Sequence, residues 1–101
     1  TARAGDAVLM HACCHNPSGA DYSLEQGAAI AAVVARKGIT PLIDLAYQGL
    51  GLGLEEDAAG IRLVLAAAED GLLAYSCDKN FGLYRDRVGA LYTLTRDAAT
   101  L

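Results

Sequence analysis

Short apolar runs alternate along the chain with longer segments of helical periodicity. Residues 7–10 form an apolar run of strand length, and a turn cluster follows at residues 15–19. Ser23 and Gln26 have the spacing of a capping box, and Gly38 is expected just past the end of the helix that begins there. The first third of the chain therefore predicts a strand and then a helix.

The second third repeats this order. Residues 40–47 predict a second buried strand, in which Pro41 is suited only to the first positions. The glycine-rich stretch 49–53 predicts a flexible loop. The acidic residues 55–57 favour the start of a second helix, because carboxylates stabilise the positive end of the helix dipole. Apolar residues then recur at helical spacing up to residue 68.

The last third predicts two more strands. Residues 72–76 form the third strand, and residues 88–95 form the fourth, whose weak alternation indicates burial on both faces. Two right-handed crossovers make the first three strands parallel. The connection at residues 77–87 is shorter than a usual crossover, so the fourth strand should be antiparallel. We predict an α/β fold with a mostly parallel sheet in three layers.

Composition and charge exclude several classes of protein. With 101 residues, 53% of them hydrophobic, the chain is long enough for one small packed domain. The net charge is −4 and no basic run occurs, so we expect no nucleic-acid binding. No apolar stretch is long enough for a membrane span, and the N-terminus lacks the apolar core of a signal peptide. The absence of an initiator Met suggests that something precedes Thr1.

The three cysteines do not resemble a disulfide framework, because their number is odd and two of them are adjacent. A reducing, cytoplasmic location is the simpler expectation. Cys13, Cys14 and their flanking histidines are zinc-ligand types, but adjacent cysteines do not readily reach one tetrahedral ion, so we expect no metal site. The glycines of residues 49–53 lack the spacing of a dinucleotide loop, and no acidic residue ends the next strand.

Polar residues follow each of the three predicted parallel strands. Asn16 follows the first strand, Asp44 and Tyr47 end the second, and Ser76 and Lys79 follow the third. Ligands of open α/β sheets bind outside the carboxyl ends of the strands, so these residues should share one edge. A lysine beside an aspartate fits pyridoxal phosphate chemistry, in which the lysine amine binds the cofactor aldehyde and the carboxylate keeps the pyridine nitrogen protonated.

Three segments carry a family resemblance. Residues 11–21 (H-A-C-C-H-N-P-S-G-A-D), 43–49 (I-D-L-A-Y-Q-G) and 76–89 (S-C-D-K-N-F-G-L-Y-R-D-R-V-G) resemble, in this order, segments of the class I aminotransferases, which are fold-type I pyridoxal phosphate enzymes. The aspartate and aromatic amino-acid aminotransferases are the most similar type. The resemblance covers essentially the whole chain and implies that residues 1–101 are part of the large, cofactor-binding domain.

The resemblance implies three catalytic residues. Lys79 would be the Schiff-base lysine and the base that moves the substrate proton. Asp44 would pair with the pyridinium nitrogen, and Tyr47 would contact the 3-oxygen of the ring.

It also implies the residues that hold the cofactor. Asn16 would reach the 3-oxygen, Ser76 and Arg87 would bind the phosphate, and His11 would support Asp44 from behind. The chain departs from the family directly before the lysine, where a small residue is usual and Asp78 stands here. This carboxylate either raises the pKa of the lysine or points to solvent, and the sequence leaves both interpretations open.

The implied activity is amino transfer between an amino acid, aspartate or aromatic, and a 2-oxo acid, by a homodimer. Two alternatives stay open: a lyase or decarboxylase of the same fold type, and a non-catalytic truncated fragment or remnant. The family's glycine-rich phosphate loop, the aromatic residue that stacks on the cofactor and the arginines that bind the substrate carboxylates have no counterpart here. We therefore expect the isolated chain to be inactive.

Overall fold

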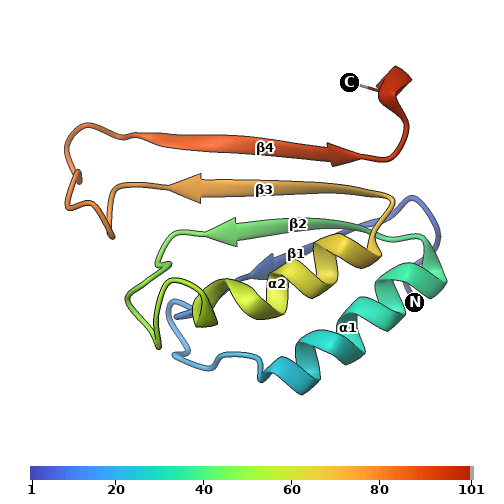
Figure 1. Ribbon diagram of the computed structural model, residues 1–101, viewed down its shortest axis with the longest axis horizontal. Helices are drawn as coiled ribbons and strands as arrows, with labels where there is room; N and C mark the ends of the chain where they lie inside the picture. The colour runs from blue at the N-terminus through green and yellow to red at the C-terminus, as the bar shows by residue number, and fades with distance from the viewer. Residues whose placement is uncertain (101) are drawn as a thin grey trace.

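The computed structural model describes residues 1–100 as an open four-stranded sheet with two helices (Figure 1). The elements are, in chain order, β1 (Ala7–His11), α1 (Leu24–Lys37), β2 (Thr40–Leu45), α2 (Glu56–Ala67), β3 (Asp70–Ser76), β4 (Gly89–Thr95) and the short 3-10 helix η1 (Ala98–Thr100). Neither α-helix is long and apolar enough to cross a membrane.

The order of the strands in the sheet follows their order in the chain. β1 pairs with β2 and β2 with β3 in parallel, whereas β3 and β4 are antiparallel, so the predicted α/β topology is confirmed. The arrowheads of β1, β2 and β3 point to the same side in Figure 1, and that of β4 points the other way. The loops that follow β1, β2 and β3 therefore leave the sheet at one edge.

The capping signals at α1 are confirmed in detail. The hydroxyl of Ser23 accepts a hydrogen bond from the amide of Gln26 at 3.1 Å, and the Gln26 side chain accepts one from the Ser23 amide at 2.9 Å. Gly38 ends the helix in the left-handed conformation, with φ of 61°, which glycine adopts without a steric penalty. The sequence thus determines both ends of this helix locally.

Both helices cover the same face of the sheet. Ile43 of β2 is fully buried beneath them, and Val34 of α1 and Val64 of α2 are almost as inaccessible. The helices approach closely at Gly27, where an added Cβ would lie 3.1 Å from the Cα of Gly60. Two of the three predicted layers therefore lie within this segment.

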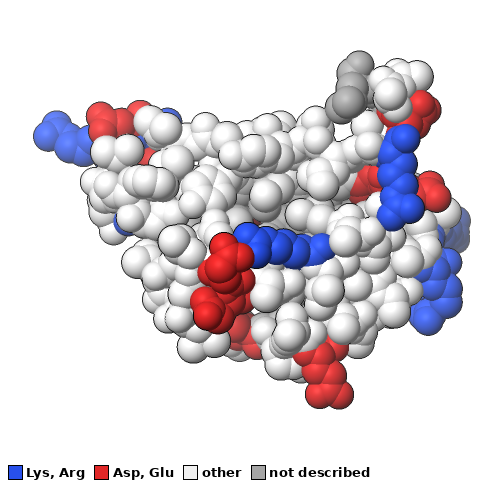
Figure 2. All heavy atoms as spheres, viewed as in Figure 1, with Lys and Arg blue, Asp and Glu red and all other residues white. Residues whose placement is uncertain are grey.

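The second face of the sheet is open in the described residues. Leu9 of β1 and Leu91 of β4 are both 65% exposed there, although strand leucines usually pack against a second layer. Figure 2, drawn from the opposite, helix-covered side, shows acidic and basic side chains together near the centre and others at the margins, with broad uncharged surface over β3 and β4. The segment thus presents much apolar surface for its size.

Two details of the strand predictions are wrong. β2 ends at Leu45 and not at Tyr47, because the last β2–β3 pair is Leu45 with Tyr75 and the chain then turns, with the Leu50 amide donating to the Tyr47 carbonyl at 3.0 Å. β4 is exposed along nearly its whole length instead of buried on both faces. It is the edge strand, and the helices pack over β1 and β2 and do not reach it.

Candidate active site

The polar residues predicted to converge do lie at the carboxyl edge of the parallel strands. His11, the last residue of β1, is directly opposite Asp44 in the β1–β2 register. The amide of Ala12 donates to the Asp44 carbonyl at 2.9 Å, which extends the pairing one residue past β1. The backbone of Asp44 is thus fixed in the sheet while its half-buried side chain faces the uncovered side, away from the Ile43 core.

Asp44 and Ser76 line the same cavity on the open face, at the end of β2 and β3. The cavity has a volume of about 230 Å³ and apolar walls from Leu9, Leu42 and Ala74. A carboxylate and a hydroxyl among apolar walls form the kind of concave site that orients a small ligand through a few polar contacts. The structure therefore brings together two of the predicted site residues.

Lys79 lies three residues beyond Ser76, in the loop between β3 and β4. Its amine lies over the ring of Tyr84, 4.8 Å from the centroid, in a cation–π contact. No hydrogen bond joins it to Asp44 or Tyr47 within residues 1–100. The structure thus places the lysine loop beside the cavity, with the amine directed within its own loop.

The Asp78 carboxylate does not point to solvent, so this one of the two interpretations left open by the sequence is wrong. Its carboxylate is buried, accepts a hydrogen bond from the Val88 amide at 3.1 Å and forms an ion pair with Arg87. Its own amide donates to the hydroxyl of Ser76 at 3.2 Å. Asp78 therefore connects the two residues, Ser76 and Arg87, that the resemblance assigns to a phosphate group.

Asn80, directly after the lysine, ties two loops together. Its amide nitrogen donates to the hydroxyl of Tyr75 at 2.7 Å and to the carbonyl of Gln48 at 3.3 Å. Among the described residues, its side-chain oxygen is buried without a partner. The lysine loop and the loop that carries Tyr47 are thus held against each other, with Tyr47 half-buried against the core.

The glycine loop after β2 is organised around Asp57. The Asp57 carboxylate, in the first turn of α2, accepts hydrogen bonds from the amides of Gly49 at 2.8 Å, Gly51 at 3.0 Å and Leu52 at 2.8 Å. Burial alone would raise the pKa of Asp57, but these backbone donors together outweigh it and hold the pKa below its usual value. Gly51 is needed here, because a Cβ would lie 2.6 Å from a carboxylate oxygen.

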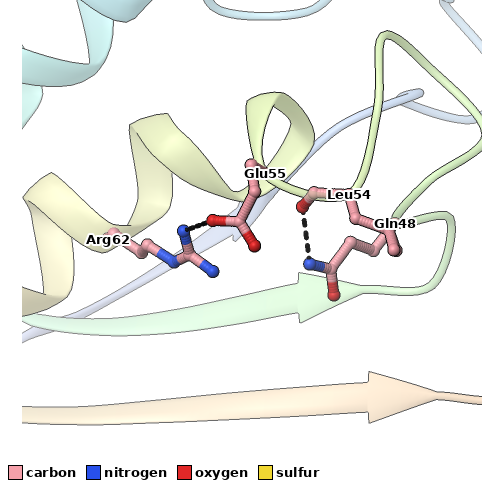
Figure 3. A network of polar contacts seen from close by, with 4 residues as sticks. All are labelled: Gln48, Leu54, Glu55 and Arg62. Atoms are coloured by element: carbon pink, nitrogen blue, oxygen red, sulfur yellow. Dashed lines mark hydrogen bonds and ion pairs between the residues drawn. The ribbon is translucent and has the colours of Figure 1, made fainter.

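A second set of contacts closes the same loop from outside (Figure 3). The Gln48 side chain donates to the Leu54 carbonyl at 2.8 Å, and Glu55, at the start of α2, forms an exposed ion pair with Arg62 about two helical turns further on. The residues directly after Tyr47 are therefore fixed by side chains on both sides of the loop.

The turn after β1 holds Asn16 at the surface. The Asp21 carboxylate accepts hydrogen bonds from the amides of Cys14 at 2.9 Å and His15 at 3.0 Å, and the His15 ring is hydrogen-bonded to Ser18. The His15 ring also meets that of His11 edge to face, with centroids 4.4 Å apart. The two histidines thus connect this turn to the residue opposite Asp44, while the exposed Asn16 side chain makes no hydrogen bond among residues 1–100.

Cys13, Cys14 and Asp57 bring three metal-ligand atoms within 4.8 Å of one another. The sequence argument against them was wrong in its geometry, because the left-handed backbone of Cys14, with φ of 51°, breaks the alternation that separates adjacent side chains. Burial is the main reason that the pKa of Cys13 is raised to about 12, and electrostatic interactions with Cys14 and Asp57 add to this rise. Metals bind the thiolate form of cysteine, so an ion here would have to displace the Cys13 proton, and the absence of a metal site stays a prediction.

Sequence reasoning missed the positional roles of Asp57 and Asn80. Asp57 is one of three consecutive acidic residues, and no spacing rule separates it from the other two. The available signal was the glycine run itself, because several amides in a compact loop need an acceptor. For Asn80 the sequence held no comparable signal, since its two partners come from β3 and from the loop after β2.

Three parallel strands with polar residues gathered at their carboxyl edge define an α/β protein, and open α/β sheets bind ligands at that edge. The sequence of residues 1–100 matches the family described as aminotransferase class I and II. The chain therefore belongs to this family, as its three motifs had indicated.

The most similar relatives include both aromatic and aspartate aminotransferases. The chain is 58% identical over 99 residues to the aromatic-amino-acid aminotransferase of Paracoccus denitrificans, covering 98% of this chain and 25% of that protein. It is 51% identical to the aspartate aminotransferase of Salmonella typhi, with 99% and 25% covered. The chain thus spans about a quarter of the length of these relatives.

Solved structures give the same result for the fold. The aromatic-amino-acid aminotransferase from Burkholderia pseudomallei, solved covalently bound to pyridoxal phosphate, is 42% identical and superposes with a TM-score of 0.90, over 97% of this chain and 25% of that one. The family therefore implies this cofactor.

Proposed function

We propose that residues 1–101 are the lysine-bearing part of the large domain of a pyridoxal phosphate-dependent aminotransferase. The protein would transfer the amino group between an amino acid, aspartate or aromatic, and a 2-oxo acid. The observation that carries the proposal is the shared cavity of Asp44 and Ser76, with the Lys79 loop leaving β3 directly beside it.

The residues at this edge fit the cofactor. Asp44 offers a carboxylate for a protonated ring nitrogen, and the cavity walls beside it are apolar, as a flat ring requires. Ser76 and Arg87 offer a hydroxyl and a guanidinium for a phosphate. When bound, pyridoxal phosphate supplies an electron-accepting ring that makes the bonds to the α-carbon of an amino acid easier to break.

The side chains of this segment would bind the cofactor and move protons. The Asp44 carboxylate, with His11 opposite it in the sheet, would hold a proton on the ring nitrogen. The Lys79 amine would hold the cofactor through its aldehyde carbon, with release of water, and, once the substrate amine has replaced and freed it, would move a proton at the substrate α-carbon. Tyr47 and Asn16 would hydrogen-bond the 3-oxygen of the ring.

One observation favours transamination over a lyase or decarboxylase, because the relatives compared above are aromatic and aspartate aminotransferases. A non-catalytic truncated fragment would keep the same site residues, so the flanking DNA separates this alternative: an open reading frame that continues on both sides supports the enzyme, and stop codons support the remnant. Because the chain spans a quarter of its relatives, activity is proposed for a complete enzyme that also contains the other parts, as a homodimer in the cytoplasm.

The test uses the two lysines of the sequence, Lys37 and Lys79. The protein is incubated with pyridoxal phosphate, reduced with borohydride and analysed by peptide mass spectrometry. We expect the pyridoxyl adduct at Lys79, a pH-dependent absorbance band that survives dialysis, and loss of both in Lys79→Ala.

Lys37→Ala is the matched control. Lys37 lies at the end of α1 and donates to the Ala2 carbonyl at 3.2 Å, far from the carboxyl edge, so this variant should keep the adduct. Equal labelling of both lysines, or a band that persists in Lys79→Ala, would contradict the proposal.

A further inference from the structure

We propose that Asp78 is a positioning residue whose carboxylate holds the guanidinium of Arg87 in place for the phosphate group of the cofactor, beside the Ser76 hydroxyl that the Asp78 backbone amide contacts. The inference rests on the proposed function, in that pyridoxal phosphate is the ligand, and it adds a role for the residue at which this chain departs from its family.

The contacts of Asp78 reach both halves of the phosphate site. One carboxylate oxygen accepts from the Val88 amide at 3.1 Å and the other pairs with Arg87, while the Asp78 amide donates to the Ser76 hydroxyl at 3.2 Å. Ser76 and Gly89 are themselves paired across β3 and β4. The contacts of Asp78 therefore link the end of β3 to the residues directly before β4.

Burial is unequal in this ion pair. The Asp78 side chain is 5% exposed and the Arg87 side chain is 71% exposed. A buried carboxylate is a fixed anchor, whereas an exposed arginine without a partner samples many rotamers. The pair thus orients Arg87 and does not bury it, and the guanidinium keeps N–H groups free for a second anion because it has five donors.

The backbone of Arg87 adds a second reason for such an anchor. Arg87 has a φ of 53°, in the left-handed region that residues other than glycine adopt only when neighbouring contacts hold them there. The Asp78 carboxylate contacts both the Arg87 side chain and the next amide, so it holds this turn from two sides.

Simple electrostatics and the positioning role predict opposite effects on phosphate binding when the Asp78 carboxylate is removed. Removing a carboxylate beside an anion site should strengthen phosphate binding through Coulomb attraction to Arg87. Positioning should weaken it, because Arg87 must then be ordered by the ligand itself. The sign of the effect separates the two explanations.

The experiment compares Asp78→Asn with the parent in the complete protein that carries this segment. Asn at this position can still accept from the Val88 amide, so the variant removes chiefly the ionic contact with Arg87. Affinity is measured for pyridoxal phosphate and for pyridoxal, which lacks the phosphate. We expect about tenfold weaker binding of pyridoxal phosphate and less than about twofold change for pyridoxal. In an Arg87→Ala background, Asp78→Asn should have no further effect.

Asp86→Asn is the control, because Asp86 is an exposed carboxylate of the same loop and should leave both affinities unchanged. Tighter binding of pyridoxal phosphate by Asp78→Asn would overturn the inference, and so would a parallel loss of both ligands.

A titration with inorganic phosphate, followed through the amide resonances of Arg87 and Val88, separates this inference from the proposed function. A protein that forms no Lys79 adduct contradicts the proposed function, yet a phosphate response that is lost in Asp78→Asn would still support the role of Asp78. The absence of a phosphate response in the parent, or a response unchanged in Asp78→Asn, would overturn that role.

Discussion

Asp57 is a nearly inaccessible carboxylate whose charge is stabilised by backbone amides and not by a cation. Its donors belong to Gly49, Gly51 and Leu52, in the loop that follows Tyr47. A single side chain at the start of α2 therefore sets the course of a loop that carries a proposed cofactor contact. Such charge-assisted hydrogen bonds are stronger than those between neutral groups.

We expect Asp57→Asn to lower the free energy of unfolding at pH 7 by about 1–3 kcal/mol, because the amide loses the charge that three donors are arranged to meet. The pKa of Asp57 is depressed in the folded state. The contribution of the Asp57 carboxylate to the free energy of unfolding is therefore complete above the unfolded-state pKa of about 3.9, and it is lost as the pH falls through the folded-state pKa. Urea unfolding as a function of pH measures this.

Glu25→Gln is the control for this prediction, because Glu25 is an exposed carboxylate in the first turn of α1. It should change stability by only a few tenths of a kcal/mol. An acid dependence that is as steep in Asp57→Asn as in the parent would show that the carboxylate contributes nothing.

For single residues, the sequence predicted which side chains lie at the site better than it predicted their contacts. Asp44 and Ser76 were predicted to share an edge, and they line one cavity. The sequence could not predict where the Asp78 side chain points. A rotation about a single side-chain bond decides whether its carboxylate faces the lysine, solvent or Arg87, and in the structure it faces Arg87. Arg87 is nine residues further along the chain and becomes its neighbour only because β4 turns back on β3.

The two helices show how glycine controls an interface between elements. Gly27 of α1 is buried against the backbone of Gly60 in α2, whereas a Cβ at Gly60 would have no neighbour within 4 Å. The two glycines are therefore not equivalent, although both lie inside helices, where glycine costs about 1 kcal/mol relative to alanine.

We expect opposite effects from the same substitution at these two positions. Gly60→Ala should raise the free energy of unfolding by up to about 1 kcal/mol through helix propensity. Gly27→Ala should lower it by about 1–3 kcal/mol, because a Cβ placed 3.1 Å from the Gly60 Cα pushes the helices apart. Thermal or urea unfolding of the two variants gives the comparison, and equal stabilisation by both would show that the helices separate without cost.

Element boundaries were predictable wherever they depend on local chemistry. Ser23, Gln26 and Gly38 act within a few residues of themselves, so both ends of α1 followed from the sequence. The end of β2 depends instead on where its pairing with β3 stops, and the exposure of β4 depends on its place at the edge of the sheet. Both are properties of the assembled sheet.

The whole molecule is a sheet with one covered face. Leu9 and Leu91 are exposed on the other, and β1 and β4 are free edges among the described strands. Apolar faces and unpaired edges of this kind promote association between copies of a chain.

We expect the isolated segment to self-associate and to bind a hydrophobic dye. Leu91→Lys should reduce both effects without a large change in stability, because Leu91 is 65% exposed. Leu52→Lys is the control, since Leu52 is 89% exposed but lies in the glycine loop, outside the sheet. Light scattering and dye fluorescence measure the outcome, and a parent chain that is a monodisperse monomer without dye binding would contradict the expectation.

The strand order β1-β2-β3-β4 has a consequence for how the chain folds. Each strand pairs with the one synthesised just before it, so no pairing has to wait for a distant part of the sequence. The two parallel pairings still join residues about 30 positions apart, so closing those loops slows folding, and the antiparallel β3–β4 pairing has the shortest connection. On the ribosome this sheet can grow one strand at a time as the chain emerges, with each helix covering the strands already paired.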